Sequence, residues 1–141
     1  LGCEPLGDDF SGDYLYAQSR GRTVAIKPFI MNGHIVVGIG NIYASEALFM
    51  AGIHPQRAAG RISRKKYVLL AEVIQEVLND AIDQGGTTLR DFVNGEGKPG
   101  YFSQHLNVYG KAGEPCISCR VPIRELRQGQ RATFYCPKCQ K

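Results

Sequence analysis

Long apolar runs are missing from this 141-residue chain. No stretch approaches the roughly 20 consecutive apolar residues that cross a bilayer, so we expect no membrane partner. Histidine is scarce, and the three that are present, His34, His54 and His105, show no metal-ligand spacing. The carboxylates are scattered, and no Ser-His-Asp arrangement or pair of acids can be assigned to acid–base work. We therefore assign no catalytic residue in the sequence given.

Acidic residues are scarce at the C-terminal end. Residues 105–141 contain seven Lys or Arg but only two Asp or Glu, a net charge of +5, whereas residues 1–104 have a net charge of −1. A basic module favours a polyanionic partner, most often nucleic acid. If only the charge is considered, a solvated basic surface that binds no partner is an equally good explanation.

Cysteine occurs at only five positions, and four of them form two C-x-x-C pairs. Cys116 and Cys119 are separated by sixteen residues from Cys136 and Cys139. This spacing is typical of a structural zinc site, in which four thiolates leave no open position for a catalytic water. Two disulfides are the alternative. Cys3 is unpaired by spacing and no apolar signal segment precedes it, which favours a reducing cytosol.

Apolar periodicity predicts a mainly α chain that ends in a small β-hairpin. Start signals, stop signals and stripes of apolar residues predict helices from the Asp8-Asp9 cap to Ser19, from 24 to 31, from 41 to 51, from 63 to 83 and from about 87 to 93. Strands are predicted at 106–109, 122–126 and 130–135. The last two form a hairpin between the cysteine pairs, with a turn near Gln128-Gly129. The glycine-rich stretch 94–100 is predicted to be a mobile loop.

A glycine-punctuated connection leads into the third predicted helix at Gly38-Ile39-Gly40-Asn41. Glycines let the backbone approach a ligand closely, and the first N–H groups of a helix are free to meet an anion. The Asn41 amide adds a donor or caps the helix. A DNA phosphate fits this arrangement, and a tight turn followed by an N-cap is the structural alternative.

Two basic side chains are further candidates for phosphate contact. Arg131 lies at the tip of the predicted hairpin, where a guanidinium on a stiff, zinc-anchored turn can bind two phosphate oxygens. Lys27 follows an apolar triplet on the second predicted helix. A snorkelling, phosphate-contacting or paired lysine is commoner at such a place than a Schiff-base amine.

The string Gly38 to Glu46 resembles the core of the helix–two-turns–helix DNA-binding domain of the bacterial formamidopyrimidine-DNA glycosylase family. The similarity extends over nearly the whole chain, in family order, and ends with a segment like the family's C-terminal zinc finger. The similar segments are Ala25–Pro28, Gly52–Pro55, Gln84–Leu89, Gly97–Phe102, Val108–Gly110, Gln130–Thr133 and Cys136–Lys141. The continuation after Asn41 favours this family over the related endonuclease VIII branch.

The resemblance implies a bifunctional repair enzyme that removes oxidised purines, such as 8-oxoguanine and formamidopyrimidines, and then cleaves the strand at the abasic site. The family's nucleophile is the amine of an N-terminal proline in a β-sandwich domain. This chain begins at Leu1-Gly2 with a segment that resembles the interdomain linker. We therefore expect the C-terminal, DNA-binding part of a longer glycosylase, inactive by itself. An endonuclease VIII-like fragment, a stand-alone damage sensor and a zinc-ribbon protein-interaction module remain alternatives.

The same resemblance implies a division of the chain and a partner. Residues 1–93 correspond to the helix–two-turns–helix domain, 94–105 to a loop on the lesion side, and 106–141 to the zinc finger. The implied partner is double-stranded DNA that contains oxidised bases or abasic sites. We expect a monomer in the bacterial cytoplasm, associated with the nucleoid through DNA.

Individual roles also follow from the resemblance, residue by residue. The four cysteines of the two pairs bind one structural zinc ion. Asn41, with Gly40 before it, and Arg131 hold phosphates that flank the lesion, and Lys27 lies near the lesion-side backbone. Lys98 and Tyr101 belong to a segment that resembles the loop that closes over the extruded base. Such a loop is needed because a damaged base must leave the stack before it can be processed.

Overall fold

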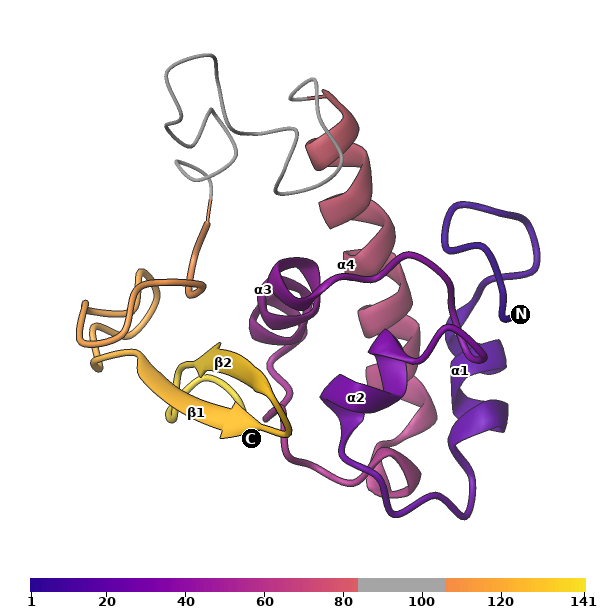
Figure 1. Ribbon diagram of the computed structural model, residues 1–141, viewed down its shortest axis with the longest axis horizontal. Coiled ribbons are helices and arrows are strands. Elements are labelled where there is room, and N and C mark those ends of the chain that lie inside the picture. The colour runs from indigo at the N-terminus through magenta and orange to yellow at the C-terminus, as the bar shows by residue number, and fades with distance from the viewer. Residues whose placement is uncertain (84–105) are drawn as a thin grey trace.

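The computed structural model describes residues 1–83 and 106–141. Within these residues a group of helices lies beside a small C-terminal hairpin (Figure 1). The elements, in chain order, are α1 (Gly12–Ser19), α2 (Ile26–Met31), α3 (Asn41–Ala51), the 3-10 turn η1 (Ala59–Arg61), α4 (Arg64–Asp83), β1 (Arg124–Gln128) and β2 (Arg131–Tyr135).

Helix α4 is the long support of the helical part, and both α1 and α3 pack against it. Its buried side recurs at three- and four-residue steps through Leu70, Ile74 and Val77. Gly12 allows α1 to come very close, because a Cβ at this position would lie 2.3 Å from the Cα of Val68. The absence of a side chain at residue 12 therefore sets the spacing between the two helices.

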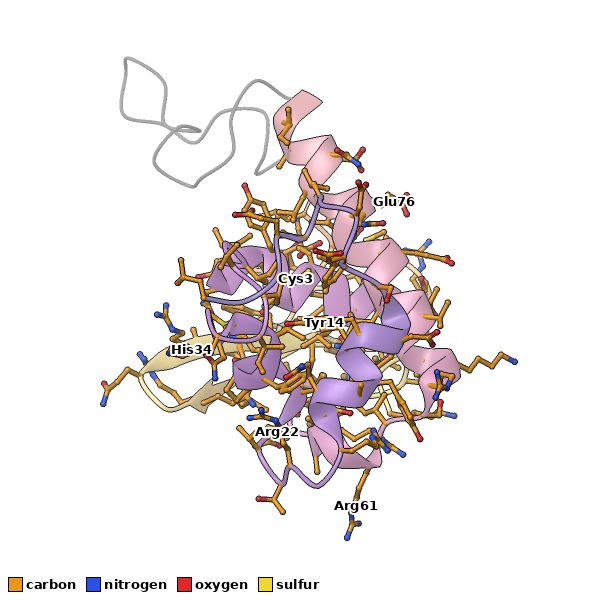
Figure 2. All side chains as sticks on the ribbon, turned by 90° about the vertical axis from the view of Figure 1, so that its right-hand side faces the viewer. Cys3, Tyr14, Arg22, His34, Arg61 and Glu76 are labelled. Carbon is orange, nitrogen blue, oxygen red and sulfur yellow. The ribbon has the colours of Figure 1, made fainter. Side chains whose placement is uncertain are left out.

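The N-terminal segment is tied to the connection between α2 and α3. Cys3 forms an isolated parallel bridge with Val36, and the Tyr14 hydroxyl donates a hydrogen bond to the carbonyl oxygen of Ile35 at 2.5 Å. Cys3 and Tyr14 both lie on the side of the molecule that faces the viewer in Figure 2. The glycine-punctuated connection is thereby held against α1 before it enters α3.

Helix α3 is buried along nearly its whole length. It begins at Asn41 and ends at Ala51, as predicted, and Gly52 terminates it in the left-handed region with φ 72°. Helices α2 and α4 cover part of its surface, and strand β2 packs against another part. The start of α3 is consequently fixed by contacts with both the helical part and the hairpin.

The hairpin is a two-stranded antiparallel sheet in which Gln128 pairs with Arg131 next to the turn. Gly129 adopts φ 62°, a conformation that suits glycine in a tight turn. Behind the hairpin a second apolar cluster forms around the cysteines, and it includes a residue from α3. Its buried members are Phe49, Val108, Cys116, Ile123, Phe134 and Cys136.

Several local predictions need correction. The first helix is capped by Ser11, whose side chain accepts the N–H of Tyr14, and not by Asp8-Asp9. The second begins at Ile26 and not at residue 24. Residues 106–109 form no strand, and the first hairpin strand is shifted to Arg124–Gln128.

Two predictions fall on residues that the structure does not describe. These are the short helix at 87–93 and the loop at 94–105. The mainly α architecture with a terminal hairpin is confirmed for the described residues. Across those residues, the structure contains no helix with both the length and the apolar content needed to span a bilayer.

Candidate functional site

The four predicted metal ligands converge. The sulfur atoms of Cys116, Cys119, Cys136 and Cys139 all lie within 4.8 Å of one another. The Sγ atoms of Cys116 and Cys139 are 3.9 Å apart, and those of Cys119 and Cys136 are 3.4 Å apart. A tetrahedral zinc ion with Zn–S bonds of about 2.3 Å separates its sulfur ligands by about 3.8 Å. The cluster therefore fits one structural zinc ion, and none of the four cysteines forms a disulfide.

Backbone N–H groups prepare these sulfurs for a cation. The N–H of Ser118 donates to Cys116 Sγ at 3.4 Å, and the N–H of Cys139 donates to Cys136 Sγ at 3.3 Å. Burial raises the pKa of the Cys116 thiol, but the N–H groups of Cys119 and Ser118, together with the thiols of Cys136 and Cys119, outweigh burial and lower this pKa to about 7. Burial and the neighbouring sulfurs raise the pKa of Cys139 to about 12. Four thiolates this close need a bound cation, which offsets their mutual repulsion.

A buried carboxylate joins the finger to α3. Glu46 is only 3% exposed, and its two carboxylate oxygens accept the N–H groups of Asn107, Val108 and Tyr109 at 2.7, 2.9 and 2.9 Å. This contact explains why residues 106–109 form no strand, because their donors bind a side chain instead of a neighbouring strand. The beginning of the finger is thus fixed to the same helix whose N-terminus is a candidate anion site.

The C-terminal end of the finger is attached to the turn that follows α3. Lys141 donates its N–H to the carbonyl oxygen of Gly52 at 3.1 Å and accepts the N–H of His54 at 3.1 Å. The Gln140 side chain donates to the carbonyl oxygen of Ile53 at 3.0 Å. The zinc cluster, the hairpin and α3 therefore form one continuous packed unit.

The start of α3 has no side-chain cap from its N-cap residue. That residue is Gly40, which has no side chain to accept one of the first N–H groups of α3. Asn41 was expected either to donate to a ligand or to cap the helix. It is the first helical residue and does not cap it, because its side chain turns toward Lys27 and the carbonyl oxygen of Ala132.

An open cavity of about 830 Å³ lies between α2 and the tip of the hairpin. Arg131 is exposed at its edge, and neither its guanidinium nor the Lys27 ammonium forms an ion pair within residues 1–83 and 106–141. The side chain of Gln128 anchors the tip by donating to the carbonyl oxygen of Pro55 at 3.0 Å. The residues that line the cavity are Lys27, Pro28, Met31, Asn32, Gln128, Gly129, Gln130 and Arg131.

Lys27 connects the two sides of this cavity. Its Nζ donates to Asn41 Oδ1 at 2.5 Å, to Thr133 Oγ1 at 2.5 Å and to the carbonyl oxygen of Ala132 at 3.3 Å. The residue is 1% exposed. Burial, together with the positive charge of Arg131, lowers the pKa of Lys27 to about 8. A cation held by neutral oxygens alone favours the arrival of an anion.

The structure thus places four of the predicted DNA-contact residues, Lys27, Gly40, Asn41 and Arg131, around one region. Lys98 and Tyr101 lie outside the described residues. Sequence reasoning missed Thr133 and Glu46, because their partners are 106 and about 60 positions away in the chain. The one available signal was the apolar triplet before Lys27, which indicates a buried position.

Sequence families match most of the chain. Residues 1–93 match the family described as "Formamidopyrimidine-DNA glycosylase H2TH domain", and residues 113–141 match "Zinc finger found in FPG and IleRS". The chain is 61% identical over 141 residues to formamidopyrimidine-DNA glycosylase from Alcanivorax borkumensis and 63% identical to that from Stutzerimonas stutzeri. All of this chain and 52% of each relative are covered, so the chain spans about half the length of these curated relatives.

Solved structures agree with the sequence matches. A complex of Lactococcus lactis Fpg with DNA containing an abasic site superposes with a TM-score of 0.89 at 35% identity, covering 100% of this chain and 52% of that one. MutM (Fpg) from Thermus thermophilus gives a TM-score of 0.88 at 34% identity, covering 99% of this chain and 53% of that one. Together with the match over residues 1–93, these results show that the chain belongs to the formamidopyrimidine-DNA glycosylase H2TH family.

Proposed function

We propose that this chain is the DNA-binding part of a bifunctional DNA glycosylase and abasic-site lyase that excises oxidised purines in base excision repair. In this proposal, residues 1–93 act as a helix–two-turns–helix unit and residues 106–141 as a zinc finger. Their shared ligand is the sugar-phosphate backbone of duplex DNA with an oxidised base or an abasic site. The chain binds as a monomer, and Lys98 and Tyr101 contribute from the lesion-side loop at 94–105.

The observation that carries the proposal is that Lys27 joins two phosphate-binding features. The N-terminus of α3, where Gly40 supplies no side-chain cap and Asn41 bonds to Lys27, offers backbone donors. Arg131, which lines the same cavity as Lys27, offers an exposed guanidinium from the hairpin tip. Both donate readily to phosphate oxygens. The zinc cluster and the Glu46 anchor hold the two features at a fixed separation. A rigid pair of phosphate clamps binds any sequence, which suits a protein that searches for damage.

The proposal assigns no chemical step to this chain alone. Strand cleavage through a Schiff base needs an accessible, unprotonated amine. The Lys27 amine is buried and donates to three oxygens, so it is unsuited to attack on a sugar aldehyde. We therefore expect that borohydride does not trap the zinc-loaded 141-residue chain on abasic DNA. Trapping on this chain would contradict the assignment of the nucleophile to the other half of the longer relatives.

Fluorescence anisotropy with a duplex that carries a tetrahydrofuran abasic analogue tests the proposed function. We expect the zinc-loaded chain to bind with an affinity that falls as salt rises. The Arg131→Ala variant should bind more weakly to every sequence, and the slope of log K against log salt should become shallower by about 1, because one phosphate contact is lost.

Arg124→Ala is the matched control. Arg124 is an exposed arginine in the same hairpin, but it pairs with Tyr135 at the end far from the turn. Arg124→Ala and Arg131→Ala change the net charge of the finger by the same amount. If the position of Arg131 decides DNA binding, Arg124→Ala should leave the slope of log K against log salt nearly unchanged. Equal effects of the two substitutions would favour nonspecific attraction to a basic surface. Unchanged affinity in Arg131→Ala would favour a protein-interaction module.

A further inference from the structure

The side chain of Lys27 makes every hydrogen bond that it can make, and it makes them inside the protein. An ammonium group has three N–H donors. Its three acceptors are Asn41 Oδ1, Thr133 Oγ1 and the carbonyl oxygen of Ala132, at 2.5, 2.5 and 3.3 Å. Because the side chain is also 1% exposed, no donor is left for a phosphate oxygen at the surface.

The partners of Lys27 belong to elements that are far apart in the sequence. Lys27 is in α2, Asn41 is the first residue of α3, and Thr133 is in β2. The separations along the chain are 14 and 106 residues. Ala132 and Thr133 directly follow Arg131, so the bonds fix the backbone immediately beside the exposed guanidinium. One side chain therefore links the start of α3 to the tip of the hairpin.

Lys27 also determines how the Asn41 amide is oriented. An ammonium can only donate, so the amide must turn its oxygen toward Lys27 and its nitrogen away. Asn41 Nδ2 accordingly donates to the carbonyl oxygen of Ala132 at 3.0 Å and to the Tyr109 hydroxyl at 3.5 Å. The bond to Tyr109 is long and therefore weak. The second N–H of the amide can exchange this weak bond for one to a phosphate oxygen.

We infer that Lys27 is a positioning residue, which does not touch DNA but orients Asn41 and holds the β2 backbone next to Arg131. This inference rests on the proposed function, because it explains how that DNA-binding surface is organised. In this inference Asn41, Gly40 and Arg131 contact phosphates. Lys27 fixes the positions of these three residues relative to one another.

A double-mutant cycle in DNA binding tests the inference. The variants are Lys27→Met, which keeps the length of the side chain, Asn41→Ala, and the two together, each zinc-loaded in the full 141-residue chain. We expect each single variant to bind the abasic-analogue duplex about tenfold more weakly, the effect of one charge-assisted hydrogen bond. If Lys27 acts through Asn41, the DNA affinity of the double variant should be less than about threefold below that of the weaker-binding single variant.

Two results would overturn the inference. One is a double variant whose fold-loss of DNA affinity equals the product of the two single fold-losses, because this result would show that Lys27 and Asn41 contact DNA independently. The other is a salt slope for Lys27→Met that becomes shallower by about 1, as for Arg131→Ala, which marks a direct phosphate contact. Failure of the unaltered chain to bind DNA would instead reject the proposed function, a result that is distinguishable from both.

The Thr133→Val variant decides the matter if Lys27→Met does not fold. Valine has nearly the shape of threonine and removes one acceptor of Lys27 while every charge stays in place. The inference predicts about threefold to tenfold weaker binding with an unchanged salt slope, and a new environment for the Asn41 side-chain NH₂ in ¹⁵N NMR spectra. Unchanged affinity together with an unchanged Asn41 signal would overturn it.

Discussion

The carboxylate of Glu46 in α3 accepts the backbone N–H of Val108 at 2.9 Å, across 62 positions of the chain. The N–H groups of Asn107 and Tyr109 bind the same carboxylate. One side chain thus satisfies three consecutive donors and fixes the first turn of the finger on the helix. The hairpin owes its place beside the start of α3 to this contact as well as to the apolar cluster around Phe49.

Replacing this carboxylate should loosen the finger. In Glu46→Gln the amide can present only one oxygen, and its NH₂ faces backbone donors, so at least one buried N–H loses its partner. We expect the free energy of unfolding to fall by about 2 kcal/mol, the range for hydrogen bonds to a charged group. Urea unfolding of the zinc-loaded chain at constant pH measures it. Glu72→Gln on the exposed side of α4 is the control and should change the value by less than about 0.5 kcal/mol.

Chelation of zinc should release the finger before the helical part. A structural zinc ion contributes on the order of 10 kcal/mol of apparent binding free energy, more than the small cluster behind the hairpin can replace. Amide hydrogen exchange after verified zinc removal should therefore show loss of protection at Thr133 and Tyr135, which pair with β1, while Leu70 and Ile74 in α4 stay protected. A hairpin that remains protected without metal would contradict the zinc assignment.

Because α1 packs closely on α4, adding one methyl group at Gly12 should destabilise the fold. Gly12→Ala would place its Cβ 2.3 Å from Val68 Cα, a backbone atom that cannot move aside without shifting a helix. We expect a loss of stability of about 1–3 kcal/mol, the usual range for overpacking. Gly33→Ala is the control, because nothing lies within 4 Å of a Cβ at that position. Equal stability of the two variants would contradict the helix spacing.

Lys27 should make stability depend on pH in a defined direction. Burial and the positive charge of Arg131 lower its pKa in the folded chain from 10.5 to about 8. Between pH 8 and 10.5 the unfolded chain therefore holds more protons than the folded one at this site. The contribution of Lys27 to the free energy of unfolding must then rise with pH across this window.

The Lys27→Met variant isolates this effect, since both proteins share all other titrating groups. The difference in unfolding free energy, unaltered chain minus variant, should increase from about pH 8 toward about pH 10. Urea unfolding at several pH values measures it. A difference that stays flat or falls would mean that the Lys27 ammonium is not destabilised by burial.

Local signals in the sequence predicted the helices well where both ends were marked. The bounds of α3 follow from the glycine connection before Asn41 and from Gly52 after Ala51, and Ser63 caps α4 by accepting the N–H of Lys66. The predicted start of α1 is wrong because the capping side chain is that of Ser11, which lies beyond the two aspartates that also fit a cap. Local patterns alone do not identify which of several polar residues accepts the first free N–H.

Contacts between residues far apart in the chain could not be predicted from local sequence patterns. The strand predicted at 106–109 is absent because its donors bind Glu46. The cysteine spacing predicted the metal cluster correctly, since two C-x-x-C pairs and a hairpin suffice to bring four sulfurs together. The buried position of Lys27 and its bond to Thr133 depend on how α2 meets β2, and no local pattern encodes that meeting.

Backbone amide NMR of the ¹⁵N-labelled, zinc-loaded chain during titration with an abasic-analogue duplex shows whether the start of α3 and the hairpin tip bind DNA together. We expect the signals of Gly40, Asn41, Gly129 and Arg131 to shift together and to saturate at one duplex concentration, while Glu72 and Glu76 on the exposed side of α4 do not respond. Shifts confined to α4, or no shifts at low ionic strength, would contradict this expectation.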